Sequence, residues 1–243
     1  MAAVMQEPFP ILKCLEIYSR DGYAPTLPAE FLGGSAPCSQ KITLCSISYP
    51  ALPTLLLSAR DLVSLDLRGI LQSGYISPEI MATSLAALPS LEHLTINFLT
   101  VTFRPDRNPP PLVTPTVIPC LTSFHFEGAW EYIEDLVARI DSPKLNRLIS
   151  YIDHDLDAQV TQLSNFIDRS GCSKLSSFRR AEVTFYLDQV VFDLHYQRLF
   201  GTTTWATIQL ETPGWRLFKM ARVLSQYSPP SFISSSSSKK HIT

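Results

Sequence analysis

The sequence predicts an α/β fold in which short parallel strands stack into a curved sheet, with helices and loops on its convex side. The main observation is a phrase that recurs along the chain: Pro, any residue, Leu, two residues, Leu or Phe, one residue, then an aliphatic or aromatic residue. Copies of this phrase have their first Leu at positions 12, 62, 91, 121 and 145; the copy at 62 lacks the proline, and the copy at 145 is degenerate. A unit that recurs in this way cannot bury its apolar face alone, so neighbouring units are expected to stack.

The spacing of the copies is the second observation. The interval from position 12 to position 62 is about twice the others, which predicts a hidden copy inside it. That copy has Ser in place of the first Leu and consists of Pro37, Ser39, Ile42 and Leu44. Units of roughly 20–29 residues with the pattern Leu-x-x-Leu-x-Leu are typical of leucine-rich repeats. We therefore predict an irregular leucine-rich-repeat solenoid over residues 1–227, with repeats that start near 12, 39, 62, 91, 121, 145 and 175.

Three segments between the copies have the apolar spacing of helices. The first begins at Ser77, a favoured N-cap residue, which is followed by Pro78 at the first helical position. The second spans about 129–140 and the third about 157–168. The residues expected to face the core are, helix by helix, Ile80, Leu85 and Leu88, with Ser84 as a polar exception; Trp130, Ile133, Val137 and Ile140; and Val160, Leu163, Phe166 and Ile167.

Segments outside the phrase are interpreted from their composition. Residues 104–119 contain three consecutive prolines and are expected to form an extended loop. Alternating apolar residues predict strands between 183 and 210, and residues 215–227 have helical spacing. Residues 228–243 are rich in serine and are expected to be a disordered tail after a single domain.

Composition excludes several classes of function. The chain has 243 residues, 45% of them hydrophobic, and a net charge of −2, so it has a globular composition without the basic footprint of a nucleic-acid-binding protein. It shows neither a secretory signal nor an apolar run long enough for a membrane span. Its five scattered cysteines are expected to be free thiols in a reducing compartment, which places the protein in the cytoplasm or nucleus.

The residues between the leucines form the candidate binding surface. Side chains alternate along a strand, so these residues face away from the core, on the concave side of the sheet. They are mixed in charge and include aromatics, as in many protein-binding surfaces. The predicted contact residues are Tyr18, Lys41, Asp66, Arg68, His93, Asn97, His125, Glu127, Arg147 and Tyr151. Tyr18, Arg147 and Tyr151 are expected to contribute most, because Arg and Tyr carry a large share of interface energy. The alternative is a solvated face without a partner.

Two patterns of residues partly resemble metal sites. Asp153, Asp155 and Asp157 alternate as in an EF-hand loop, but the Gly and Glu that such a loop requires are replaced by Ala158 and Ser164. Helix capping is the preferred interpretation of these carboxylates.

His93 and His125 lie one repeat apart on the outward side, with Glu127 as a further candidate ligand. Zinc requires four ligands, and the nearest cysteine pair, Cys38 and Cys45, is seven residues apart. We predict no metal site.

Patterns of catalytic residues are equally sparse. The sequence lacks the Gly-x-Ser-x-Gly elbow of hydrolases and a glycine loop that could hold phosphates. We therefore predict a protein that is not an enzyme and needs no cofactor. The remaining alternative within the enzymes is a small hydrolase with an unrecognised site.

Four phrases in the first half of the chain carry a family resemblance: Phe31–Pro37, Leu55–Ala59, Gly74–Glu79 and Leu88–Leu94. Together they resemble the leucine-rich-repeat portion of the large F-box protein families of mushroom-forming fungi. The resemblance continues more weakly through residues 141–145 and 172–175 to about 215.

The resemblance implies a substrate receptor of a cullin-class ubiquitin ligase, in which an F-box binds the adaptor and the repeats bind the substrate protein. Only eleven residues precede Leu12, which is too few for an F-box. Leu27–Leu32 is similar to the opening of an F-box, but Gly33 and Gly34 end any helix there, so we interpret the segment as a loop. An adaptor is expected to bind only if an F-box lies upstream. The alternative is a truncated or degenerate repeat protein that has kept no partner.

Overall fold

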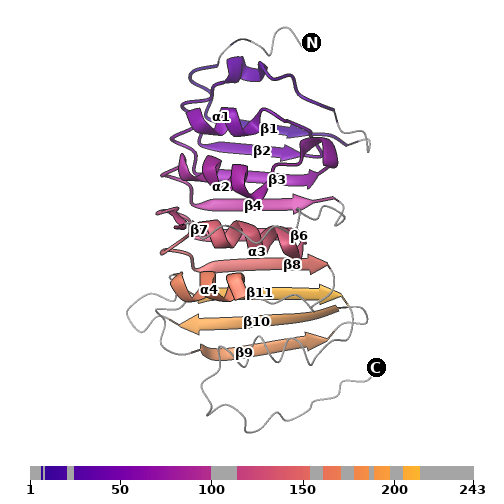
Figure 1. Cartoon of the computed structure of the whole chain (residues 1–243), viewed down its shortest axis with the longest axis vertical. Coiled ribbons are helices and arrows are strands. Elements are labelled where there is room, and N and C mark those ends of the chain that lie inside the picture. Colours follow the sequence, from indigo (N-terminus) through magenta and orange to yellow (C-terminus); the bar gives the residue numbers. More distant parts are fainter. Residues whose placement is uncertain are drawn as a thin grey trace.

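The computed structural model describes residues 7, 9–20, 25–99, 114–153, 161–170, 178–185, 189–197 and 205–213. It has an α/β fold built on a nine-stranded sheet with the order β1-β2-β3-β4-β6-β8-β11-β10-β9. Figure 1 shows these strands stacked along the long axis of the molecule. The first six strands in this order follow the chain and run parallel, as the sequence predicts. They are β1 (Cys14–Tyr18), β2 (Lys41–Cys45), β3 (Ser64–Ile70), β4 (His93–Phe98), β6 (Ser123–Ala129) and β8 (Arg147–Asp153).

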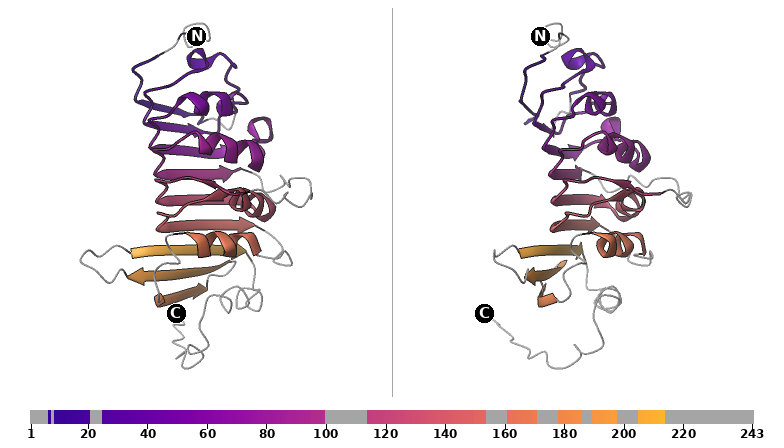
Figure 2. Two further views of the ribbon diagram at one scale, coloured as in Figure 1. Left: turned by 60° about the vertical axis from the view of Figure 1, so that its left-hand side comes forward. Right: turned by 90° about the vertical axis from the view of Figure 1, so that its left-hand side faces the viewer.

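The helices lie on one face of this sheet, and Figure 2 shows the opposite face without them. The helical elements are η2 (Phe31–Gly34), α1 (Leu52–Ser58), η3 (Gln72–Gly74), α2 (Pro78–Ala86), α3 (Trp130–Arg139) and α4 (Thr161–Arg169). A small second sheet pairs β5 (Thr116–Val117) with β7 (Ile140–Asp141). None of the helices in the described part of the chain is both long enough and apolar enough to cross a membrane.

The apolar residues of the recurring phrase form continuous rows in the core. Leu65 of β3 is paired with Leu94 of β4, and Leu94 with Phe124 of β6. These three side chains are almost completely buried. The same register extends the row at both ends, so that it contains Leu15, Ile42, Leu65, Leu94, Phe124 and Leu148. Burying this row stabilises every strand through its neighbours, because none of the strands can shield its own apolar face.

An identical turn precedes each of the six strands. The backbone N–H at the first leucine position of each phrase donates to the carbonyl three residues earlier; the donors are Leu12, Ser39, Leu62, Leu91, Leu121 and Leu145. The carbonyl of the following residue then accepts two N–H groups from the next unit. For example, the Lys13 carbonyl accepts from Gln40 and Lys41, at 2.8 and 3.1 Å. This backbone arrangement recurs at carbonyls 40, 63, 92 and 122, so the copies predicted from sequence adopt one local structure.

Helix α2 confirms the predicted N-cap and the predicted inward face, except at Ile80. Ser77 Oγ accepts the Ile80 N–H at 3.3 Å, as expected for a capping serine. However, Ile80 is 49% exposed and Ser84 is buried. The hydroxyl of Ser84 donates to the Ile80 carbonyl at 2.9 Å, which satisfies the buried polar group within the helix. The prediction that Ile80 faces the core is therefore wrong, whereas Leu85 and Leu88 are buried as expected.

Helices α3 and α4 agree with the prediction and pack on each other. Leu163, Phe166 and Ile167 of α4 are buried, as are the four predicted inward residues of the α3 region, Trp130, Ile133, Val137 and Ile140. The Glu134 carboxylate of α3 accepts the N–H groups of Gln162 and Leu163, at 2.9 and 2.8 Å. It thereby caps the start of α4 from a neighbouring helix. Burial raises the pKa of Glu134 to about 7, although the two backbone N–H groups oppose this shift.

The last three strands differ from the predicted stacking order. β9 (Phe178–Phe185), β10 (Gln189–Gln197) and β11 (Trp205–Pro213) form an antiparallel meander. The final strand, β11, pairs in parallel with β8. The strand that follows the phrase at Leu175 is therefore β9, which lies at the far edge of the sheet rather than next to β8. Only three residues separate β9 from β10, a length that favours antiparallel pairing over a return to the parallel stack.

Several predicted segments lie wholly or partly outside the described residues. These are residues 104–113, the start of the predicted third helix with Val160, the helix over 215–227, the tail over 228–243, and Leu175 itself. The described end of the predicted loop, residues 114–119, contains the short strand β5. Its pairing with β7 ties this segment to the chain that follows α3.

Candidate functional site

The sheet face opposite the helices is the candidate functional site, and we refer to it as the open face. Its side chains come from β1, β2, β3, β4, β6 and β8 and alternate with the buried residues of the core. All ten contact residues predicted from sequence lie on it. The strand register aligns the residues of the open face in three rows that cross the six strands.

We number the rows from the start of the strands. The first row is Cys14, Lys41, Ser64, His93, Ser123 and Arg147. The second row is Glu16, Thr43, Asp66, Thr95, His125 and Ile149. The third row is Tyr18, Cys45, Arg68, Asn97, Glu127 and Tyr151, with Asn97 beside an irregularity in β3.

An ion pair links the first two strands at one end of the open face. Lys41 of β2 pairs with Glu16 of β1, and the hydroxyl of Tyr18 donates to the second oxygen of Glu16 at 3.4 Å. The hydrogen bond from Lys41 lowers the pKa of Glu16, and the same contact raises the pKa of Lys41. Tyr18 is 51% exposed, so its ring remains available to a partner.

A second set of contacts organises the middle of the open face. The guanidinium of Arg68 donates to Asp66 at 2.9 Å within the same strand. Asn97 of β4 accepts the Gly69 N–H at 2.9 Å and donates its amide to Glu127 of β6. Asn97 therefore bridges β3 and β6 and holds the Glu127 carboxylate in place.

The Asn97 contact depends on an unusual backbone position. The register between β3 and β4 shifts after Leu67, and Gly69 has a φ of +61°. This left-handed conformation is costly for residues with a side chain. It turns the Gly69 N–H toward β4, where the Asn97 side chain accepts it.

His125 lies half-buried near the end of the open face. Its ring centroid is 5.3 Å from that of Tyr151, with the two planes tilted by 46°. Nε2 is buried and has no hydrogen-bond partner among the described residues. Burial lowers the pKa of His125, and the nearby cations Arg68 and Arg147 lower it further, while Glu127 and Asp66 oppose the shift. The environment of this imidazole therefore favours its neutral form.

Arg147 is exposed and differs from the other cations of the open face. Lys41 and Arg68 each contact a carboxylate, whereas Arg147 contacts none within the described part of the chain. Its neighbour in the row is Ser123, and His93 follows on β4. His93 lies 4.0 Å from the Glu92 carboxylate, and both side chains are more than half exposed.

The two histidines considered as zinc ligands are not directly opposite each other. His93 is paired with Ser123 and His125 with Thr95, so the histidines are diagonal neighbours on adjacent strands. Among the described residues, the structure brings together no group of three His, Cys, Asp or Glu side chains that could hold a metal ion. Of the three alternating aspartates, Asp153 ends β8, while Asp155 and Asp157 lie outside the described residues.

Sequence reasoning missed part of the first row. Ser64 and Ser123 precede Asp66 and His125 by two positions on their strands, Cys14 precedes Tyr18 by four, and all three share the orientation of these contact residues. Extending the alternation toward the start of each strand would have found them. The alignment of residues into rows could not be inferred in this way, because it depends on the register between strands.

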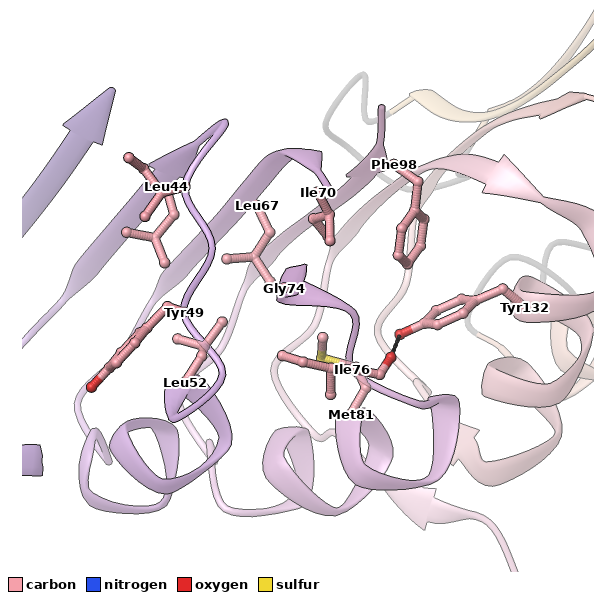
Figure 3. A pocket seen from close by; sticks show the side chains of 11 residues that line it. Leu44, Tyr49, Leu52, Leu67, Ile70, Gly74, Ile76, Met81, Phe98 and Tyr132 are labelled. Carbon is pink, nitrogen blue, oxygen red and sulfur yellow. Dashed lines mark hydrogen bonds between the residues drawn. The ribbon is translucent and has the colours of Figure 1, made fainter. Parts of the chain in front are cut away.

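A small cavity of about 20 Å³ lies on the helix side of the sheet, between the carboxyl ends of β2–β4 and the helices (Figure 3). Its lining is mainly apolar and includes Leu67, Met81 and Phe98. The hydroxyl of Tyr132 donates to the Ile76 carbonyl at 3.0 Å at one end of it. A space of this size holds about one water molecule, so it is a packing defect rather than a ligand site.

Compared with protein-family models, curated proteins and solved structures, the chain shows no match. The functional argument therefore depends on the open face. This surface offers an exposed aromatic ring at Tyr18, exposed cations and fixed carboxylates on a rigid sheet. Such a combination can form hydrogen bonds, ion pairs and ring contacts with another macromolecule.

Proposed function

We propose that the chain is an irregular leucine-rich-repeat solenoid whose open face recognises another protein. The six stacked units, each with the same turn and the same backbone contact to its neighbour, support the repeat assignment. Their spacing follows the leucine-rich phrase of the sequence. Repeats of this kind are commonly used as extended binding surfaces.

The observation that carries the proposal is the continuity of the three rows. They cross six strands without a covering helix, as Figure 2 shows. The internal contacts Lys41–Glu16 and Arg68–Asp66 hold several side chains in place before any partner arrives. A surface that is already ordered loses less conformational entropy on binding than a flexible one.

The family resemblance of the sequence suggests what kind of partner binds. We propose that the open face holds a substrate protein for a ubiquitin ligase of the cullin class. The adaptor of such a ligase would bind an F-box upstream of the repeats rather than the repeats themselves. The open face and the adaptor contact are thus separate parts of the proposal.

Two double variants on the open face test the proposal. Arg147→Ala/Tyr151→Ala alters its β8 end, and Tyr18→Ala/Arg68→Ala alters its third row at the other end. The control is Arg60→Ala/Leu57→Ala, which removes an exposed cation and a 51% exposed apolar side chain from the helix side. Each protein is used to select binders from a displayed library of random peptides, and the selected binders are then measured on all variants.

We expect the wild type to select binders that both open-face variants lose and that the control retains. Circular dichroism spectra should be the same for all four proteins, because the altered side chains lie outside the core. Binders that depend on Leu57 and Arg60 instead would show that recognition occurs on the helix side of the sheet. Selection of no specific binders would refute recognition by the open face.

A further inference from the structure

The first row of the open face has a one-sided charge. Its ionisable side chains other than the thiol of Cys14 are Lys41, His93 and Arg147, so no carboxylate belongs to it. Lys41 is already neutralised by Glu16 of the second row. The remaining basic groups lie on β4 and β8, on either side of Ser123 of β6.

These groups are close enough to contact one ligand. Adjacent strands are about 4.8 Å apart, so His93 and Arg147 stand about 10 Å apart at the backbone, with Ser123 between them. His125 follows Ser123 by two residues on the same strand and side. Arg147, Ser123 and His93 therefore stand on neighbouring strands in the first row, and His125 lies next to Ser123 on the same side of β6.

The carboxylates around these groups either have a basic neighbour or stand apart from Ser123. The Glu92 carboxylate, for example, lies 4.0 Å from Nε2 of His93. Glu127 is four residues along β6 from Ser123, which corresponds to about 13 Å, and the Asn97 amide holds it there. Asp66 contacts Arg68 on β3. An acidic group of a partner is thus repelled from the third row near Glu127 and attracted to the first row near Arg147.

We propose that the point around Ser123 binds a carboxylate side chain, Asp or Glu, in an acidic segment of the partner. This inference rests on the proposed function and specifies the chemistry of the partner. Arg147 supplies the positive charge and a planar pair of N–H donors that matches a carboxylate. Ser123 and His93 supply further hydrogen bonds.

The charge of the site favours a carboxylate over a phosphate. Burial lowers the pKa of His125, and the nearby arginines lower it further, so this imidazole favours its neutral form. Arg147 is then the permanent charge at this point, and one guanidinium balances the single charge of a carboxylate. A phosphate group carries nearly two negative charges at pH 7 and would be left partly uncompensated.

Three acetylated and amidated peptides of equal length test this inference. One contains two adjacent glutamates between Gly and Ser residues, the second has glutamines in their place, and the third has one phosphoserine. Binding to the full chain is followed by NMR through the backbone amide signals of Ser123 and Arg147. The variants are Arg147→Ala, Arg147→Lys and the control Lys41→Ala, which removes a neutralised cation from the same row.

We expect the glutamate peptide to shift both signals to saturation and the glutamine peptide to leave them unchanged. Arg147→Ala should weaken binding about tenfold or more, the usual effect of losing a charge-assisted bidentate contact. Arg147→Lys should fall between Arg147→Ala and the wild type, because it keeps the charge but loses the planar pair of donors. Lys41→Ala should change the affinity less than about twofold, the level expected of an exposed charge outside the contact.

Three results would overturn the inference. Equal binding of the glutamate and glutamine peptides would show that charge is not recognised. Equal losses of affinity for the glutamate peptide in Arg147→Ala and Lys41→Ala would indicate that the peptide is attracted by the net charge of the protein rather than bound at a specific site. Tighter binding of the phosphoserine peptide than of the glutamate peptide would assign the site to phosphate.

The outcome can be separated from that of the proposed function. The variant Tyr18→Ala/Arg68→Ala does not touch Arg147, so its effect on the selected library binders tests the open face independently. If those binders are lost while the glutamate peptide fails to bind, recognition by the open face stands and the carboxylate assignment falls. If the library yields no open-face binder, the proposed function itself falls.

Discussion

The hydroxyl of Ser39 donates a 3.1 Å hydrogen bond to the carbonyl of Leu12, across the boundary between the first two units. Ser39 is completely buried and occupies the position that leucine fills in the other copies of the phrase. The polar contact replaces the apolar one because the hydroxyl finds an acceptor in the neighbouring turn. The hidden copy is therefore adapted to its neighbour at this position.

Ser39→Ala should destabilise the protein by about 1 kcal/mol, since it removes one buried hydrogen bond and leaves the Leu12 carbonyl without this partner. Ser39→Leu restores the phrase but should cost more, because the larger side chain must enter a fully packed site. Urea unfolding measures both changes. The control, Ser73→Ala, alters an exposed serine and should stay within about 0.5 kcal/mol of the wild type. A stabilising effect of Ser39→Leu would show that the site has spare room.

Gly69→Ala should destabilise the protein more than Gly34→Ala, although both residues have similar backbone conformations. Their φ angles are +61° and +68°, so a side chain costs about 1–2 kcal/mol at either position. A Cβ at Gly69 would also lie 2.7 Å from the Ser46 hydroxyl, whereas one at Gly34 meets nothing within 4 Å. Thermal unfolding of both variants, and of Gly69→Ala/Ser46→Ala, tests the explanation. The double variant should recover part of the loss, and a lack of recovery would exclude the contact with Ser46 as its cause.

Tyr132→Phe should destabilise the protein by about 1–2 kcal/mol, because the buried Ile76 carbonyl loses the hydroxyl that donates to it at 3.0 Å. The matched control is Tyr49→Phe, whose hydroxyl makes a longer contact of 3.4 Å to the Phe31 carbonyl. Since long hydrogen bonds are weak, its loss should be smaller. If chemical denaturation gave equal losses of unfolding free energy for Tyr132→Phe and Tyr49→Phe, this ranking would be contradicted.

The stability of the protein should depend on pH through Glu134. Its pKa is about 7 in the folded protein and 4.5 in its absence, so the folded state binds the proton more tightly. The resulting contribution, up to about 3 kcal/mol, is complete below pH 4.5 and is lost as the pH rises through 7. Glu134→Gln removes this dependence.

The measurement is urea unfolding of the wild type and of Glu134→Gln between pH 4.5 and 8. The difference between their unfolding free energies should change in favour of the variant as the pH rises, while the other titrating groups cancel. Glu79→Gln, on the exposed side of α2, serves as the control for the same change of residue type at the surface. A constant difference for Glu134→Gln would mean that this carboxyl does not titrate in the range.

The strands and the contents of the open face could be predicted from sequence because both follow from local alternation. In β4, for example, Leu94 and Ile96 are buried while His93, Thr95 and Asn97 face the opposite side. The alternation needs no knowledge of neighbouring strands. The turn before each strand could also be located, since proline occurs in five of the six copies and the first leucine in five.

Features that depend on competing or distant contacts could not be predicted. Helix α1 contains three consecutive leucines, Leu55, Leu56 and Leu57. Such a run does not indicate which side of a helix faces the solvent, and in the structure Leu57 is exposed while Leu55 and Leu56 are buried. The order of β9 and β11 is decided by pairing between strands rather than by any local pattern. The bridge from Asn97 to Gly69 and Glu127 requires the register shift in β3, which no spacing in the sequence reveals.

The paired N–H contacts at carbonyls 13, 40, 63, 92 and 122 have a consequence for how this protein can evolve. They use main-chain atoms alone. The intervals between these carbonyls vary from 23 to 30 residues, while the pair of hydrogen bonds stays the same. Insertions and deletions therefore change the length of the connecting segments on the helix side of the sheet. Side chains on the open face can be substituted without affecting these backbone contacts. The side chains of the open face can therefore diverge by mutation while the backbone architecture is kept.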